Sequence, residues 1–431
     1  LYRNDGSSFT RVTEEAGLRT YGLTLSATIG DLNNDSYPDI YISNDFSSPD
    51  FMYMNNGDGT FSDVVKETTN QTSFYGMGVD IADFNNDSYL DYIQVDMDAK
   101  DNRRSKANMA SMNPDLFWST VNYGFHYQYM HNTLQLNRRI QGDKPFFSNI
   151  SRLSGISSTD WSWGPLLADL DNDGWKDLFI SNGIRREINH RDFFNDIKLR
   201  PMSSDSLLYY TEQMPSEAIA NFTFQNNSDL TFTDVSESWG LDQKNFSNGA
   251  TYADLDNDGD LELIVNNVDQ EAQIYRNNST NNFIKVKLKG SDQNLIGIDS
   301  RVFVKTPNNS QMQELTLSRG FQSSVSTYLN FGLGDESIIE SVKVVWPNGN
   351  SEQLNNVDIN TTIEFDINNS NKETLSDEKL NVYFENEQIV SHKHEENIYD
   401  DYAKEVLLPH ENSKLGPGIA TGDINGDGLD D

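Results

Sequence analysis

The feature of this 431-residue chain that most constrains its fold is a nine-residue acidic pattern that recurs five times. Each copy reads D-x-[DN]-x-D-[GS]-x-x-[DE], and the copies begin at Asp31, Asp83, Asp169, Asp254 and Asp423. Oxygen-bearing side chains at positions 1, 3 and 5 of a tight loop, a main-chain carbonyl at position 7 and a carboxylate at position 9 can converge on one hard cation. The pattern therefore predicts five metal-binding loops.

Calcium is the expected cofactor, because Ca²⁺ takes about six to eight oxygens whereas Mg²⁺ prefers a smaller octahedron with retained waters. The alternative is that the windows are surface turns that bind nothing, since Asp, Asn, Gly and Ser all favour turns. Five copies with the same spacing favour metal binding over turns that bind nothing. The predicted ligands are Asp31, Asn33, Asp35, Tyr37, Asp39, Asp83, Asn85, Asp87, Tyr89, Asp91, Asp169, Asp171, Asp173, Trp175, Asp177, Asp254, Asp256, Asp258, Asp260, Glu262, Asp423, Asn425, Asp427, Leu429 and Asp431.

Short runs of β-branched and aromatic residues follow the first four loops, at 40–42, 92–95, 178–180 and 263–265. Such runs predict strands. An EF-hand instead closes its shell at position 12 between two helices, so EF-hand and dockerin interpretations are disfavoured. Ser36 and Ser88 replace the usual glycine at position 6, which predicts turns that are slightly strained or loosened in the first two loops.

The loops are part of a longer repeat, because they start 52, 86, 85 and 169 residues apart. A period near 50 with short strands is typical of propeller blades. A hairpin motif recurs in phase, with an apolar strand, an Asn/Gly turn and a returning aromatic residue, at 1–9, 53–61, 134–147 and 224–232. The longer gaps hold partly helical insertions at 97–132 and 184–218, which form either a binding surface or a simple cover.

These loops and hairpins resemble FG-GAP/VCBS repeats, the blades of integrin-α-like β-propellers. Residues 283–365 resemble an ASPIC/UnbV domain, although Asp299-Ser300 and Phe321 depart from its usual residues. The motifs that carry this second resemblance are Phe283 to Gly290, Gly297 to Val302, Arg319-Gly320-Phe321, Asn330 to Gly334 and Val344 to Gly349. Together they resemble the cartilage-acidic-protein-like FG-GAP/ASPIC-UnbV proteins of Bacteroidetes.

The resemblance implies an all-β fold: a calcium-loop propeller followed by a β-rich ASPIC/UnbV domain and the start of a second propeller. We expect propeller blades at 1–280, the ASPIC/UnbV domain at 283–366, a linker at 367–380 and the second FG-GAP propeller from 381 to 431. The chain begins inside a hairpin and stops on the last acid of a loop, so we expect a fragment of a larger protein. The family is typically secreted, at the cell surface or associated with a bacterial outer membrane.

The net charge of −35 excludes some partners, because 67 acidic side chains against 32 basic ones repel nucleic-acid phosphates. Of the acidic side chains, 18 stand at predicted ligand positions. No apolar run is long enough to span a membrane. With no cysteine there is no zinc-thiolate site and no cysteine nucleophile. An aromatic content of 11% indicates packed cores rather than disorder.

Three further features leave alternatives open. His392 and His394, near Glu395 and Glu396, form a metal site or an ordinary surface pair. Trp161 and Trp163 stack on sugars or, as is more common, pack between blades. The alternation of apolar residues and lysines at 284–289 predicts a half-buried strand, either a lysine-guarded edge strand or one that faces an acidic partner.

The sequence contains no G-x-S-x-G, P-loop or H-E-x-x-H motif, and we predict no catalytic residue. The expected function is a calcium-binding, non-catalytic extracellular or cell-surface protein that mediates adhesion by binding a glycan or a protein. The alternative is a secreted hydrolase or lyase that acts on polysaccharide at the propeller face.

Overall fold

The computed structural model describes residues 1–18, 21–46, 48–109, 112–141, 144–200, 204–372, 393–396, 398–405, 412–416, 418 and 420–428. The chain divides into two compact units, Leu1–Glu373 and Thr374–Asp431, which we call unit 1 and unit 2 and describe separately. Among the described residues, no helix has the length and apolar character needed to cross a membrane.

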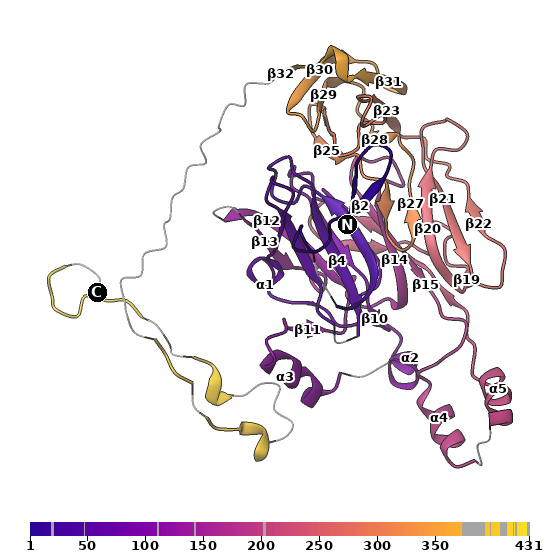
Figure 1. Cartoon of the computed structure of the whole chain (residues 1–431), viewed down its shortest axis with the longest axis vertical. Coiled ribbons are helices and arrows are strands. Elements are labelled where there is room, and N and C mark those ends of the chain that lie inside the picture. Colours follow the sequence, from indigo (N-terminus) through magenta and orange to yellow (C-terminus); the bar gives the residue numbers. More distant parts are fainter. Residues whose placement is uncertain are drawn as a thin grey trace. The chain divides into compact units, whose positions relative to one another are not determined.

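Unit 1 contains four antiparallel sheets that are the blades of an open propeller arc (Figure 1). Blade 1 consists of β3 (Leu23–Gly30), β4 (Asp39–Asp45), β5 (Phe51–Asn55) and β6 (Phe61–Asp63). Blade 2 consists of β8 (Val79–Ala82), β9 (Asp91–Gln94), β12 (Thr133–Gln141) and β13 (Lys144–Asn149). Blade 3 consists of β14 (Asp160–Ala168), β15 (Asp177–Asn182), β17 (Phe222–Asn226) and β18 (Phe232–Asp234), with β10 (Met97–Asp98) beside β14. Blade 4 consists of β20 (Ser247–Ala253), β21 (Glu262–Asn267) and β22 (Gln273–Tyr275).

The acidic loops connect the first and second strands of each blade, so the strands predicted after them are confirmed. In each blade the position-9 acid is the first residue of the second strand and pairs with the residue before the loop, for example Asp39 with Gly30 and Asp91 with Ala82. The predicted hairpins are also confirmed, including the N-terminal pair β1 (Tyr2–Asn4) and β2 (Phe9–Arg11). This local order is that of FG-GAP blades and not of helix-flanked EF-hands.

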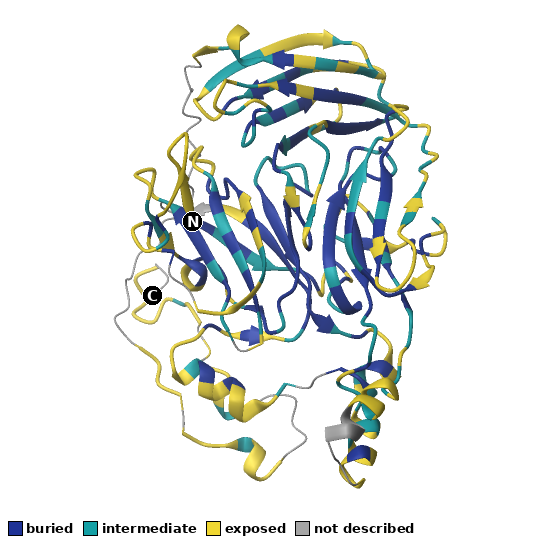
Figure 2. Cartoon of the chain, turned by 45° about the vertical axis from the view of Figure 1, so that its right-hand side comes forward, coloured by how far each residue is buried: buried dark blue, intermediate teal, exposed yellow. Residues whose placement is uncertain are grey.

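The core lies between neighbouring blades, whose strands are mostly buried (Figure 2). Tyr41 of blade 1 and Tyr92 of blade 2 pack with their ring centroids 4.5 Å apart. Trp161 is buried, and the Trp163 indole donates its Nε1–H to the Gly183 carbonyl at 2.6 Å. Both tryptophans therefore have the packing role that the sequence analysis held to be more common.

The two insertions contain the predicted helices, at the end of the blades opposite the C-terminal sheets of unit 1 (Figure 1). Side-chain caps explain where two of them begin, because Asp101 and Asn113 accept main-chain N–H groups of the first turn. The helices and short flanking elements are α1 (Val65–Thr68), α2 (Asn102–Ala107), α3 (Pro114–Asn122), α4 (Arg191–Lys198), α5 (Ser204–Glu212), β7 (Thr72–Ser73), β11 (Gln128–Tyr129), β16 (Ile219–Ala220) and β19 (Lys244–Asn245).

The chain then forms a second set of sheets that packs on the loop end of the blades. One sheet has the order β28-β23-β31 and the other β25-β24-β29-β30-β32, and their shared core includes Trp346, Phe331 and Phe365. The elements are β23 (Asn282–Lys289), β24 (Arg301–Lys305), β25 (Ser310–Glu314), β28 (Leu329–Gly334), β29 (Ile339–Val345), β30 (Asn350–Val357), β31 (Thr361–Asp366), η1 (Ile367–Asn369) and β32 (Asn371–Lys372). We call residues 282–372 the C-terminal β-domain.

The lysine-rich strand β23 lies between β28 and β31, so the interpretation as a solvated edge strand is wrong. The predicted burial of the apolar residues is confirmed, since Ile284, Val286 and Leu288 are buried. The neighbouring strands could not be predicted, because they come from segments far along the chain. Lys285 is itself buried and contacts the acidic propeller.

A short hairpin of the C-terminal β-domain, β26 (Ser318–Arg319) and β27 (Ser323–Ser324), enters the centre of the arc and contacts the first strand of all four blades. Gly320 exchanges main-chain hydrogen bonds with Val79 of blade 2 and accepts a bond from Ser26 Oγ of blade 1. Phe321 packs on Trp163 of blade 3, with ring centroids 5.0 Å apart, and Ser324 accepts a bond from Thr251 of blade 4. We call this segment, residues 318–324, the central hairpin.

Described parts of unit 2 contain η2 (Asp401–Ala403), η3 (Asn412–Lys414) and a fifth acidic loop within 423–428. Residues 373–392, which cover most of the predicted linker and the beginning of the predicted second propeller, lie outside the described residues. The second propeller and the domain limits stay predictions.

Candidate calcium loops

The acidic loops share one turn geometry, which is set by hydrogen bonds from main-chain N–H groups to the carboxylates. In the third loop, Asp169 accepts bonds from Asp173 N at 3.0 Å and Gly174 N at 2.9 Å, and Asp173 accepts one from Trp175 N at 2.8 Å. The equivalent bonds to Asp31 and Asp83 are present in the first and second loops. The loops are therefore repeats in structure as well as in sequence.

Two positions of the turn take up left-handed backbone conformations. Position 6 has positive φ throughout, and Ser36 and Ser88 adopt 71° and 67° where the third and fourth loops have glycine, as the strained turns of the sequence analysis require. Position 4 was missed by the sequence analysis, although its recurrent asparagine was the available signal, since Asn tolerates this conformation. The position-4 residues are Asn34, Asn86, Asn172 and Asn257, with φ between 57° and 63°.

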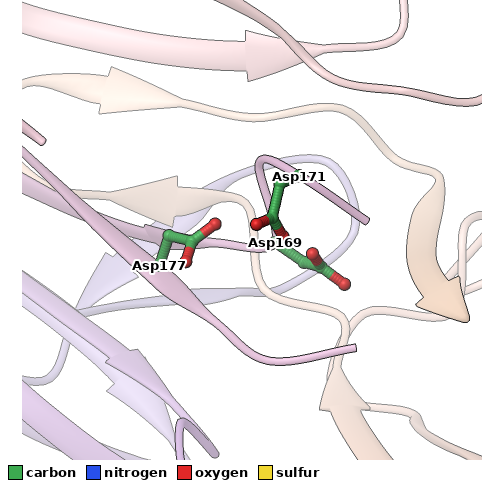
Figure 3. Close-up of side chains that lie close together, drawn as sticks. All are labelled: Asp169, Asp171 and Asp177. Carbon is green, nitrogen blue, oxygen red and sulfur yellow. The ribbon is translucent and has the colours of Figure 1, made fainter. Parts of the chain in front are cut away.

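Carboxylate oxygens converge most closely in the third and fourth loops. One oxygen each from Asp169, Asp171 and Asp177 lie within 4.8 Å of one another, and Figure 3 shows these three side chains gathered at the loop. Asp254, Asp256 and Glu262 form the same group in blade 4. In the first two loops position 3 is an asparagine, so those loops offer one carboxylate fewer.

The carboxylate at position 9 also accepts hydrogen bonds from two separate parts of its blade, which the sequence did not indicate. In blade 1, Asp39 accepts the N–H of Leu32 in its own loop at 2.9 Å and the N–H of Asn55 on the third strand at 2.8 Å. The same pair of bonds recurs at Asp91, Asp177 and Glu262. Each such acid thus ties its loop to the third strand of its blade.

The asparagine on the third strand also joins consecutive loops. Asn137 Nδ2 donates to the carbonyls of Leu90 in its own blade's loop and Leu32 in the preceding loop, at 3.1 and 3.0 Å. Asn226 makes the equivalent bonds in blade 3, and in blade 4 Asn277, which follows the third strand β22, does the same. The four loops are therefore connected in series by hydrogen bonds.

Burial raises the pKa of the most deeply buried loop carboxyl groups, because a charged carboxylate loses solvation there. The pKa of Asp39 rises to about 8 and that of Asp83 to about 7. The pKa values of Asp91 and Asp177 also rise well above their usual range for the same reason. A bound divalent cation would restore the charged form of these groups.

Whether the residues fit such an ion can be judged from the buried oxygen atoms that accept no hydrogen bond. Among the described residues nothing donates a hydrogen bond to Asp254 Oδ1 or to either carboxylate oxygen of Asp260, and all three atoms are buried in the fourth loop. Hard oxygen donors of this kind are the ligands that Ca²⁺ prefers. The residues of the loop therefore fit calcium, with Asp254, Asp256 and Glu262 as the group that would hold it.

Cations of the C-terminal β-domain contact the loops directly. Lys285 Nζ lies 2.6 Å from Asp254 Oδ2 of the fourth loop, and Arg301 Nη2 lies 3.1 Å from Asp31 Oδ2 of the first. In the third loop, Asp169 Oδ2 accepts the N–H of Gly332 at 3.1 Å. The C-terminal β-domain thus docks on the same carboxylates that the sequence assigns to calcium.

In unit 2, Asp423 accepts N–H bonds from Asp427 at 3.1 Å and Gly428 at 2.7 Å, as in the other loops. Asn425 also accepts a bond from Asp427 N. Leu429 and Asp431, the remaining predicted ligands, lie outside the described residues. His394 Nε2 is 3.4 Å from Glu396 Oε1, and His392 is likewise outside the described part of the chain.

Without calcium, we expect the chain to be more stable at pH 5 than at pH 7.5. The pKa values of Asp39, Asp83 and Asp169 rise to about 8, 7 and 7, so between about pH 4 and 8 the folded state binds more protons than the unfolded state, and stability falls as the pH rises. Burial lowers the pKa of His131 to about 4 and also lowers that of His126, which acts in the opposite sense but involves fewer groups. Thermal melts of the calcium-stripped chain at the two pH values measure the difference, and a higher melting temperature at pH 7.5 would contradict it.

Comparison with known proteins identifies the class of both parts of unit 1. Residues 31–93 match the model of the FG-GAP-like repeat, and residues 290–372 match the model of the ASPIC and UnbV family. The first blades of the arc thus match FG-GAP-like repeats, whose loop geometry recurs in the later blades, and the C-terminal β-domain is an ASPIC/UnbV domain.

Over about 80% of its length the chain is homologous to cartilage acidic protein 1. It is 23% identical to the Mus musculus protein over 360 residues, which is 80% of this chain and 46% of that protein. It is also 23% identical to the Homo sapiens protein over 362 residues, 82% of this chain and 45% of the relative. The chain therefore spans about half the length of these relatives.

Proposed function

We propose that this chain belongs to a calcium-binding, non-catalytic extracellular protein that mediates adhesion by binding a glycan or another protein. The observation that carries the proposal is the set of four blade loops with related turn geometry and buried carboxylates, together with oxygens of the fourth loop that have no partner among the described residues. Extracellular modules bind calcium weakly enough to need its high concentration outside cells, at about 10⁻⁴–10⁻³ M. The name of the relatives, cartilage acidic protein, agrees with an extracellular site and an acidic surface.

We place the ligand site on the helical insertions, in a cavity of about 390 Å³ that we call the insertion pocket. Arg104 lines this cavity and is held in place by hydrogen bonds from its guanidinium to Asp160 at 2.5 and 2.8 Å and to Glu187 at 3.0 Å. Asn108 lines the same cavity and is buried, and among the described residues neither atom of its side-chain amide has a hydrogen-bond partner.

An unpartnered amide in a polar cavity supports recognition of a neutral polar ligand. Leaving a buried donor and acceptor unpaired costs about 1–3 kcal/mol, which a ligand would recover if the covering side chains moved and let it pair both atoms. A pair of sugar hydroxyls or a peptide group offers one acceptor and one donor at the right spacing. The acidic groups beside Arg104 leave no surplus of positive charge in the pocket, so an anionic ligand is disfavoured.

We expect Asn108→Ala to weaken ligand binding by about tenfold, because one bidentate amide contact is lost. The measurement is a screen of glycans and extracellular-matrix proteins against the chain in 2 mM calcium, about the extracellular level, followed by titration of each hit. Asn122→Ala, at an exposed asparagine of α3, is the matched control and should bind as the unaltered chain does. Equal loss in both variants would remove the insertion pocket from the proposal. Turnover of a polysaccharide that Asn108→Ala abolishes would favour the enzyme alternative instead.

A further inference from the structure

The ASPIC/UnbV domain packs on the fourth acidic loop through its strand β23. Phe283 lies so close to Gly259 that a Cβ atom there would overlap the phenyl ring, and the φ of Gly259 is 99°. Two residues further on, Lys285 Nζ lies 2.6 Å from Oδ2 of Asp254, the first predicted ligand of the loop. On the neighbouring strand β28, Asn330 Nδ2 donates to the Gly259 carbonyl at 3.1 Å. The domain therefore places a ring, an ammonium group and an amide directly against this loop.

The ion pair between Lys285 and Asp254 is buried, with side chains that are 8% and 3% exposed. The Lys285 ammonium also lies 5.3 Å from the centre of the Tyr328 ring. Lys287 stands on the same face of β23 and pairs with Glu364 at 2.6 Å, but both of these side chains are nearly half exposed. Because water and salt screen a buried pair less, Lys285 acts on its carboxylate partner more strongly than Lys287 does.

The two carboxylate oxygens of Asp254 have different surroundings. Oδ2 accepts hydrogen bonds from Lys285 Nζ and from Gly259 N, the latter at 3.1 Å. Oδ1 is buried and accepts no hydrogen bond from any described residue. A carboxylate oxygen of Asp254 lies within 4.8 Å of those of Asp256 and Glu262. Oδ1 is therefore the oxygen left for an ion, and the ion and Lys285 would share one carboxylate.

The fourth loop carries more negative charge than the other blade loops. All five of its odd-numbered positions are acidic, whereas the first and second loops have three acids each and the third has four. The number of charged ligands is one factor that sets the calcium affinity of a loop, so this count alone would make the fourth loop the tightest. Lys285 opposes that effect, because its positive charge is fixed beside the first ligand.

The first loop shows why this arrangement is particular to blade 4. Arg301 contacts Asp31 there, with Nη2 3.1 Å from Oδ2, but its Nε also pairs with Glu314 at 2.8 Å. The charge of Arg301 is thus offset by a carboxylate of the same domain. Lys285 forms an ion pair with Asp254 and with no other carboxylate of the described residues.

We propose that Lys285 competes with calcium for Asp254, so that the ASPIC/UnbV domain sets the calcium concentration at which the fourth loop fills. This inference rests on the calcium binding proposed above. An ammonium group and a divalent ion on one carboxylate repel each other by an amount that lowers the calcium affinity about tenfold even at the dielectric constant of water. By linkage, calcium in the loop weakens the contact of Lys285 by the same factor. The coupling acts on this contact and not on docking as a whole, since the central hairpin contacts no predicted ligand of the loop.

The test is hydrogen exchange of the whole chain over a calcium titration, read at residues 254–262. The N–H groups of Leu255 and Gly259 donate to Glu262 and Asp254, so their protection reports whether the loop is ordered. In Lys285→Met we expect the midpoint of protection to fall to about one tenth of the calcium concentration that the unaltered chain needs. The midpoints of the second and third loops should not change. Lys287→Met is the matched control and should leave the midpoint of the fourth loop unchanged.

The melting temperature of Lys285→Met shows whether it folds, and a second measurement on the unaltered chain needs no variant. Reductive methylation of Lys285, followed by mass spectrometry, should speed up as calcium fills the loop, with Lys287 as the internal reference. An unchanged or higher midpoint in folded Lys285→Met, or methylation of Lys285 that calcium leaves constant or slows, would overturn the competition while calcium still protects the loops. Absence of calcium protection at every loop would refute the proposed calcium binding itself.

Discussion

Removal of calcium at pH 7.5 lowers the melting temperature of unit 1 by about 4–9 °C, the largest effect that we expect from a change of solution conditions. Each of the four blade loops contributes about 0.6–1.8 kcal/mol at about 2 mM calcium if its dissociation constant is about 10⁻⁴–10⁻³ M, which sums to about 3–7 kcal/mol. The physical reason is that carboxyl groups such as Asp91 and Asp177 are buried without enough positive charge nearby, which raises their pKa. A bound calcium ion would supply the missing positive charge.

Calorimetry with and without excess chelator measures the shift, and magnesium at the same concentration is the control, because it fits an all-protein oxygen cage poorly. Loss of one ligand should act beyond its own loop. Asp171→Ala should speed hydrogen exchange in blade 3 and also at Asn277, which bonds to the carbonyl of Leu170 in that loop. An unchanged melting temperature in excess chelator would contradict calcium binding by the blades.

The elements that could be predicted from the sequence are those fixed by local spacing. The pattern that starts at Asp31 fixes a turn and the strand that follows it, because the bonds from Asp35 N and Ser36 N to Asp31 span only four and five residues. Hairpins such as 53–61 are local for the same reason. The repeat then assembles the blades, since every copy buries its strands against the next.

What the sequence could not show depends on contacts between distant segments. Lys285 was read as a solvent-facing residue of an edge strand, yet it is buried against Asp254, and the strand beside it, β31, comes about 75 residues later in the chain. The same holds for blade 4. Its hairpin motif is present at Tyr275-Arg276-Asn277, and only the structure shows that the residues that follow enter β23 and not a fourth strand of the blade. The sequence pattern shows which residues repeat, but it does not show at which strand a repeat stops.

Arg319→Met should destabilise unit 1 by about 3–5 kcal/mol, because it leaves a buried carboxylate without its partner. Arg319 stands on the central hairpin, and its Nη1 donates to Asp80 Oδ1 at 3.0 Å and to the Ile81 carbonyl at 2.7 Å in blade 2. Asp80 also accepts the N–H of Leu167 in blade 3 at 2.7 Å. One ion pair therefore connects the ASPIC/UnbV domain with two blades at the centre of the arc, where water cannot replace either partner.

Denaturant unfolding of the variant in calcium measures the loss, and two further variants separate the ion pair from the rest of the hairpin. Lys305→Met removes an exposed pair with Glu340 and should cost about 0–1 kcal/mol. Combining Arg319→Met with Asp80→Asn should recover part of the loss, because the buried charge is then gone. If Arg319→Met costs no more than Lys305→Met, the central hairpin is not what holds the ASPIC/UnbV domain to the blades. Docking would then rest on the loop contacts that Lys285 and Arg301 make with Asp254 and Asp31.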